Sequence, residues 1–89
     1  KQGAIEKEVE DYTRVIDGLA GAPVELVALA LNNRGLAYRM QGEFEKEIAD
    51  YTRVMEGLEG APAEQVAKAQ SCRQSTYSNH GIKQKTSKE

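Results

Sequence analysis

Apolar side chains recur along this chain at intervals of three and four residues, which is the spacing of one side of an α-helix. An early stretch with this spacing comprises Ile5, Val9, Tyr12, Ile16 and Leu19. A later stretch comprises Phe44, Ile48, Tyr51, Met55 and Leu58. Between the two, the spacing continues at Val27, Leu31, Arg34 and Tyr38. No segment alternates with the period of two that is typical of a half-buried strand, so the pattern predicts an all-α fold.

The chain also repeats itself with an offset of 39 residues. Residues 2–40 placed on residues 41–79 without a gap share 21 of 39 residue types. The most similar part is the run from Asp11 to Val15, which returns unchanged 39 positions later. A repeat of this length is typical of proteins built from stacked supersecondary units.

The spacing and the repeat together predict four helices, at about 4–18, 23–40, 43–58 and 62–77. Pro23 stands at the start of the second helix, where its fixed φ suits the first turn. Gly42 permits a tight turn between the second and third helices. Because that connection is short, we expect these two helices to be antiparallel neighbours.

The run from Ala30 to Tyr51 resembles a tetratricopeptide repeat (TPR). The family's glycine and aromatic landmarks fall on Gly35, Tyr38, Gly42, Phe44 and Tyr51. The resemblance implies a right-handed stack of antiparallel helical hairpins, in a variant whose period is 39 residues instead of the family's usual ~34.

The resemblance also divides the chain. Residues 1–79 form the repeat domain, with a half-repeat at about 1–20, a full repeat at about 23–58 and the first-helix half of a last repeat at about 62–79. Residues 80–89 lack an apolar face, and we expect them to be a disordered basic tail.

Two residues depart from the family's pattern. Glu47 occupies a position where a small residue is usual, and Arg34 replaces an apolar residue before Gly35. One interpretation is an ion pair between Arg34 and Glu47 across the hairpin. The alternative is that both side chains lie along the apolar stripe with their stems and extend their charged ends into water.

Charge is unevenly distributed. Residues 1–69 carry 8 basic and 13 acidic side chains (−5), whereas residues 70–89 carry 4 basic and 1 acidic (+3). The acidic body disfavours nucleic-acid binding. No apolar run approaches the ~20 residues of a membrane helix, and no signal segment is visible. Together with the single cysteine, this leads us to expect a cytoplasmic protein without a membrane partner.

The residue inventory offers little for catalysis or metal binding. Cys72 is the only cysteine and His80 the only histidine, so a zinc ligand set is missing. The pair Ser71-Cys72 has neither a base nor an orienting group nearby in sequence. We therefore expect neither an enzyme nor a cofactor.

Binding through a surface remains, and the resemblance implies a groove lined by the first helix of each hairpin. The corresponding residues are Leu29, Asn32, Asn33, Leu36, Arg39, Met40, Lys68, Ser71 and Cys72. Asn33 with Lys68 partly resembles the residues by which some family members hold a C-terminal carboxylate. The predicted partner is a protein or peptide, although these positions could instead be ordinary solvated ones.

The alternative function is structural. Ile5, Val9 and Tyr12 belong to a stripe that expects an upstream helix, since isolated repeats cannot bury their apolar faces alone. The chain could thus be part of a longer array without a groove ligand, or associate with a second copy through this face.

Overall fold

The computed structural model describes residues 2–18 and 21–81, and this part of the chain is helical throughout apart from its connecting turns. The four α-helices are α1 (Gln2–Thr13), α2 (Val24–Met40), α3 (Phe44–Thr52) and α4 (Ala63–His80). Two π-helical segments, η1 (Arg14–Gly18) and η2 (Arg53–Gly57), continue α1 and α3. No strand occurs within these described ranges, which confirms the all-α prediction.

The two π-helical segments occupy equivalent places in the repeat. Arg14–Gly18 and Arg53–Gly57 are related by the offset of 39 residues, and both read Arg-Val-x-x-Gly. The same local sequence thus gives the same widened turn twice. Helices α1 and α3 thus each end in a π-helical turn.

The fourth helix ends three residues later than predicted. It ends at His80, which the sequence analysis placed in the tail, and Gly81 terminates it with a left-handed φ of 64°. The ring of His80 stacks on that of Phe44 at the start of α3, with centroids 4.1 Å apart. The ring contact therefore favours the longer helix, and the left-handed glycine ends it. The rest of the predicted tail, residues 82–89, lies outside the described residues.

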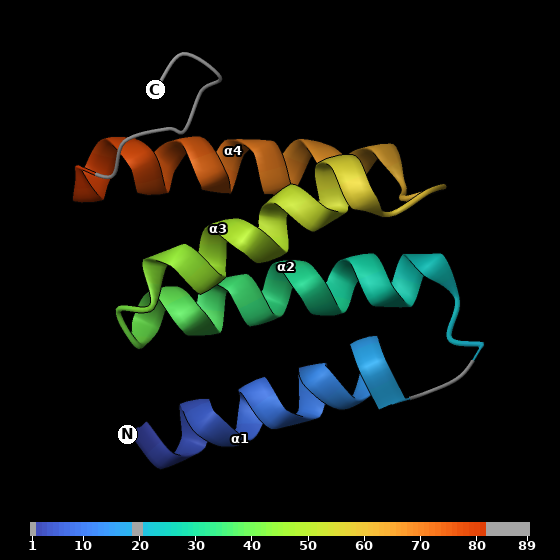
Figure 1. Ribbon diagram of the computed structural model, residues 1–89, viewed down its shortest axis with the longest axis horizontal. Coiled ribbons are helices and arrows are strands. Elements are labelled where there is room, and N and C mark those ends of the chain that lie inside the picture. Colours follow the sequence, from blue (N-terminus) through green and yellow to red (C-terminus); the bar gives the residue numbers. More distant parts are fainter. Residues whose placement is uncertain (1, 19–20, 82–89) are drawn as a thin grey trace.

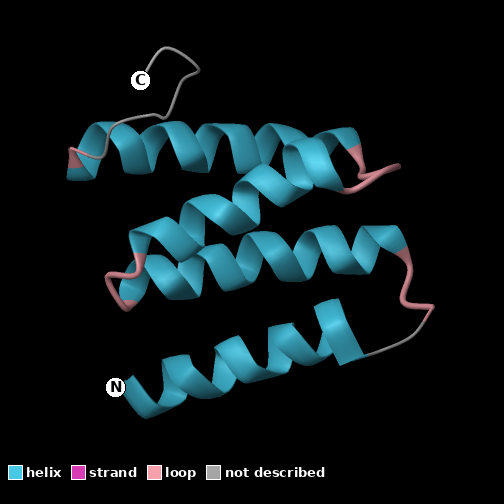
Figure 2. Ribbon diagram, viewed as in Figure 1, coloured by secondary structure: helices cyan, strands magenta, loops and turns pink. Residues whose placement is uncertain are grey.

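Helix α2 is central to the stack. It contacts α1, α3 and α4, whereas α1 contacts neither α3 nor α4 within the described ranges. Figure 1 shows α1 and α4 on opposite sides of the α2/α3 pair. The turns alternate between the two ends of the stack, so consecutive helices run antiparallel (Figure 2). Gly42, with a φ of 77°, makes the turn between α2 and α3.

The core is formed by side chains from α2, the end of α3 and α4. Its buried members are Ala28, Leu31, Tyr51, Val54 and Ala69. Alanine and glycine allow the helices to approach closely. A Cβ atom on Gly35 would lie 2.5 Å from Cε1 of Tyr51, so the tyrosine ring rests directly on the glycine backbone.

Candidate functional site

An apolar stripe runs along the uncovered side of α2. Leu26, Leu29 and Met40 are 41%, 40% and 68% exposed, and they are the large apolar side chains exposed in the described part of the chain. The stripe also contains the half-buried Asn33 and Leu36, so its members are spaced 3, 4, 3 and 4 residues apart. This set, Leu26, Leu29, Asn33, Leu36 and Met40, is called the α2 stripe below. Exposed apolar patches often mark binding surfaces.

The remaining sides of α2 are occupied by its neighbours. Leu31 is completely buried in the core that α2 shares with α3. Two residues along a helix turn a side chain by roughly 200°, so Leu29 points away from that core. Arg34 reaches α1, where its Nη1 donates to Oγ1 of Thr13 at 3.0 Å. Asn32 faces α4 and donates from Nδ2 to the side-chain Oε1 of Gln65 at 2.8 Å.

Helix α4 continues the surface with polar residues. The positions 39 residues after the α2 stripe are Gln65, Lys68, Cys72, Ser75 and Asn79. Lys68 and Asn79 are exposed, and the thiol-bearing Cys72 is half-buried and unpaired with another cysteine. The joint surface of α2 and α4 thus combines an apolar half with a polar half that carries one cation.

Two predicted groove residues face α4 and not the groove. Asn32 is 1% exposed, and its Nδ2 also donates to the backbone oxygen of Gln65 at 3.1 Å. Arg39 donates from Nη2 to the backbone oxygen of Cys72 at 3.0 Å and to Oγ1 of Thr76 at 2.7 Å, both on α4. Both groove assignments are therefore wrong, because these positions lie one helix face closer to α4. Leu29, Asn33, Leu36, Met40 and Lys68 keep positions compatible with the groove.

The predicted ion pair between Arg34 and Glu47 is also wrong. Arg34 donates from Nε and Nη2 to the two carboxylate oxygens of Asp50, at 2.9 and 2.7 Å. In an antiparallel hairpin, residues near the turn pair with each other, and residues farther from it pair in turn. Arg39 therefore meets Glu47, and Arg34 meets Asp50. The hydrogen bond to Asp50 raises the pKa of Arg34.

Glu47 ties three helices together from a fully buried position. Its Oε2 accepts hydrogen bonds from Nε of Arg39 at 2.7 Å, from the Tyr51 hydroxyl at 2.8 Å and from Oγ1 of Thr76 at 2.8 Å. Arg39 extends the network, since its Nη2 donates to Oγ1 of Thr76 and to the backbone oxygen of Cys72. Burial acts to lower the pKa of Arg39, but the bond to Glu47 and its charge outweigh burial, and the pKa is raised.

This network, which we call the Glu47 network, stabilises the packing of α2, α3 and α4. Its arginine contacts α3 and α4, and its hydroxyl groups are held by carboxylate and guanidinium partners. Burial, followed by the hydrogen bond to Glu47, raises the pKa of Tyr51. The tyrosine therefore stays neutral in the folded chain when an exposed tyrosine would ionise.

The free energy of unfolding should consequently fall above about pH 10, the ordinary pKa of tyrosine. Tyr51 ionises first in the unfolded chain, so the unfolded state binds fewer protons and is favoured as pH rises. The expected slope from this group is about 1.4 kcal/mol per pH unit. Urea unfolding of the wild type and of Tyr51→Phe between pH 9 and about 11.5 measures it. Equal slopes in both chains would contradict the assignment.

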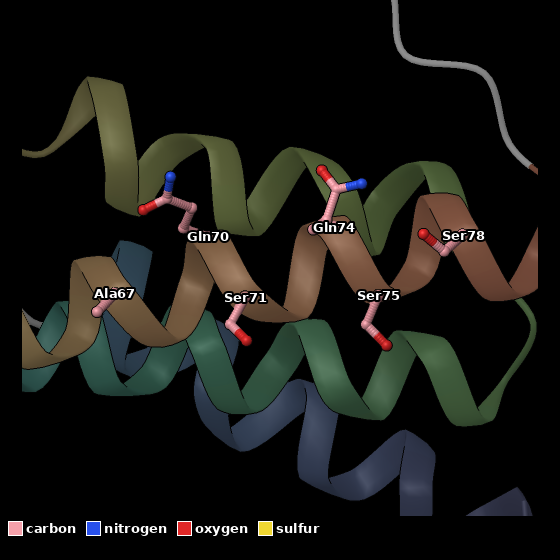
Figure 3. A pocket seen from close by; sticks show the side chains of 6 residues that line it. All are labelled: Ala67, Gln70, Ser71, Gln74, Ser75 and Ser78. Carbon is pink, nitrogen blue, oxygen red and sulfur yellow. The ribbon is translucent and has the colours of Figure 1, made fainter.

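Ser71, a predicted groove residue, is exposed on α4. It lines a hollow of about 380 Å³. The lining residues are uncharged and comprise Ala67, Gln70, Ser71, Gln74, Ser75 and Ser78. Figure 3 shows the two glutamines on one side of the helix, with Ser71 and Ser75 on the other. Ser75 belongs both to the hollow and to the α4 row equivalent to the α2 stripe, so the hollow adjoins the surface that α4 shares with α2.

The face predicted for self-association lies on α1. Ile5, Val9 and Tyr12 are each half-buried, and α1 packs on α2 alone among the described helices. The face is therefore less exposed than the α2 stripe.

Residues 2–18 and 21–81 contain no group of three histidine, cysteine, aspartate or glutamate residues placed to hold a metal ion. None of the helices described is both long and apolar enough to cross a bilayer.

Two residues that are important in the structure, Leu26 and Asp50, were not predicted from the sequence. Leu26 extends the α2 stripe, and its spacing of three residues from Leu29 was a sufficient signal. Asp50 is the partner of Arg34, and only the pairing order of the hairpin could have identified it. Comparison of the chain with models of protein families, with curated proteins and with solved structures found no match in any of the three.

Proposed function

We propose that this chain is a protein-interaction module of the tetratricopeptide-repeat type, which binds a peptide segment of another protein along the α2 stripe. The observation that carries the proposal is the gathering of the exposed large apolar side chains of the described chain, Leu26, Leu29 and Met40, on one side of one helix. Exposure of these side chains to water is unfavourable, and a partner that covers them removes that cost.

The packing order of the helices supports the repeat type. In a stack of hairpins, the first helices of successive hairpins are neighbours and line one face. Here α2 contacts α4, its equivalent in the next repeat, whereas α1 and α3 do not touch each other within the described residues. The α2 stripe and the equivalent row of α4 then belong to the lined face of a right-handed stack.

The chemistry of this surface indicates the ligand. The apolar half on α2 accommodates apolar side chains, and Lys68 on α4 supplies a cation beside it. Asn33 provides an amide that can donate to the same acceptor. The favoured ligand is a peptide segment with apolar side chains and a carboxylate, either an acidic residue or the C-terminus, that reaches Lys68.

Selection from a random-peptide display library tests this function. We expect enriched peptides to be apolar with a carboxylate, and to lose at least about tenfold in affinity, 1.4 kcal/mol, for the double variant Leu29→Ser/Met40→Ser. The matched control is Ala49→Ser on the exposed side of α3, which should bind like the wild type. Peptides that bind the wild type, the double variant and the control equally would show that the ligand does not bind the α2 stripe. A selection without enrichment would also contradict the proposal.

The alternative function is that of a structural segment of a longer array, or of a self-associating chain. The half-buried apolar residues of α1, which packs on α2 alone in the described structure, favour it. Light scattering over a range of concentrations separates the two, because self-association through α1 predicts a dimer or larger species. A monomer that binds the selected peptides would support peptide binding along the α2 stripe.

A further inference from the structure

Helix α1 carries a second copy of the surface that α3 uses to hold α2. Asp11 and Tyr12 correspond to Asp50 and Tyr51 through the offset of 39 residues. On α3, both residues are engaged by the preceding helix. Asp50 receives two hydrogen bonds from Arg34 and is 5% exposed, and Tyr51 is completely buried.

The neighbour of Tyr51 on α2 is a glycine for a steric reason. The ring lies so close to Gly35 that a Cβ atom would approach Cε1 to 2.5 Å and Cζ to 3.0 Å. Since Arg34 and Gly35 are adjacent, one short segment of α2 supplies both a charge for the aspartate and space for the tyrosine. An Arg-Gly pair on one helix is thus complementary to an Asp-Tyr pair on the next.

The side of α1 that contacts α2 carries Thr13 and differs from the side that carries Asp11. Thr13 accepts a hydrogen bond from Nη1 of Arg34 at 3.0 Å, and the equivalent contact from Arg73 to Thr52 joins α4 to α3 at the same distance. Helices α1 and α3 therefore present the same side to the helix that follows them. The Asp-Tyr side of α3 faces the preceding helix, whereas α1 has no preceding helix among the described residues and packs on α2 alone (Figure 1).

The exposure of the two residues agrees with this placement. Asp11 is exposed and Tyr12 is half-buried, whereas their equivalents on α3 are buried. No ion pair of Asp11 occurs in the described structure, which shows pairs at Asp50 and Glu47. The surface formed by Asp11 and Tyr12 is called the Asp-Tyr face.

We propose that the Asp-Tyr face is a docking site for one helix of the α2 type, which presents an arginine to Asp11 and an adjacent glycine to Tyr12. Charge complementarity and the close glycine contact define this occupant, and the α2/α3 pair shows both contacts within the same chain. The site is distinct from the α2 stripe, because it lies on α1, where Asp11 is turned by roughly 200° from Thr13, the residue that contacts α2.

A second copy of this chain does not supply the required helix. Its α2 is already covered by its own α1, α3 and α4. Its α4 has Arg73 at the arginine position but Gln74 at the glycine position. The Cβ atom of that glutamine would meet Tyr12 as a Cβ atom on Gly35 would meet Tyr51. The occupant is therefore a helix from outside the described chain.

A chain extension tests the proposal directly. A copy of residues 23–39 is fused in front of Lys1, so that Gln2 and Gly3 form the turn that Gln41 and Gly42 form between α2 and α3. Covalent attachment raises the effective concentration of a helix that would be only marginally stable alone. We expect the melting temperature to rise by at least about 5 °C relative to the unextended chain.

Two matched variants distinguish specific docking from a general effect of added helix. In the first, the copied glycine of the extension is replaced by glutamine, as at Gln74. In the second, Asp11→Asn removes the carboxylate from the extended chain. Both should lose most of the gain, and Asp11→Asn should leave the melting temperature of the unextended chain within about 2 °C.

An unchanged melting temperature on extension would overturn the proposal. So would an equal rise with the glutamine-bearing extension, since the glycine contact would then be irrelevant. Peptide binding to the α2 stripe should be the same in the extended and unextended chains, so failure of this docking site and failure of the proposed groove are separate outcomes.

Discussion

Changing Arg39 to methionine should lower the free energy of unfolding by about 3–5 kcal/mol. Glu47 is fully buried, and Arg39 is the cation that forms its ion pair. Without that cation, the Tyr51 and Thr76 hydroxyls remain as hydrogen-bond donors, but the carboxylate keeps an uncompensated buried charge. Urea unfolding followed by circular dichroism measures the loss.

Two further variants identify the cause of that loss. In Arg39→Met/Glu47→Gln the buried charge is absent, so we expect most of the stability to return. Arg14→Met removes an exposed arginine from η1 and should change the free energy of unfolding by no more than about 0.5 kcal/mol. A double variant as unstable as Arg39→Met would show that the methylene packing and hydrogen bonds of Arg39 matter more than its charge.

Gly35→Ala should destabilise the protein by about 1–3 kcal/mol, although alanine is the better helix former by about 1 kcal/mol. The new Cβ atom would lie 2.5 Å from Cε1 of Tyr51, a ring with no exposed surface and therefore no space to move into. The α2/α3 hairpin would have to open. Thermal or urea unfolding of the variant measures the cost.

The matched control for this change is Gly3→Ala on α1, where nothing lies within 4 Å of the new Cβ atom. That variant should be as stable as the wild type or more stable by about 0.5–1 kcal/mol. In a Tyr51→Leu background the ring is gone, so Gly35→Ala should cost little. An equal cost in both backgrounds would refute the role of the ring contact.

The helices and the repeat could be predicted because they are periodic properties of the chain. The stripe from Ile5 to Ile16 and its copy 39 residues later gave two of the four helices, and Pro23 and Gly42 gave boundaries that the structure reproduces within a few residues. The end of α4 was the exception. Its extension to His80 depends on a ring contact with Phe44, a residue 36 positions earlier that no local pattern connects to it.

The charge pairs could not be predicted from periodicity, because periodicity places residues on a helix face without fixing which residues meet across a hairpin. Arg34 was assigned to Glu47, three residues from its actual partner Asp50. Arg39 was assigned to the groove because the resemblance places first-helix residues there. In the structure it pairs with the buried carboxylate of Glu47 on α3 and also donates hydrogen bonds to α4. Leu29 and Met40, whose assignment rests on the same resemblance, are exposed.

The sequence of α4 bears on whether identical copies of this chain could assemble into filaments. A repeat unit whose front and back surfaces fit each other forms a heterologous contact, and when the rotation between copies does not close a ring, such contacts propagate into open filaments. Three residues of α4 differ from the α2 residues that hold α3: Gln70 replaces Leu31, Gln74 replaces Gly35 and Ser78 replaces Arg39. These replacements weigh against an open, head-to-tail assembly of identical chains.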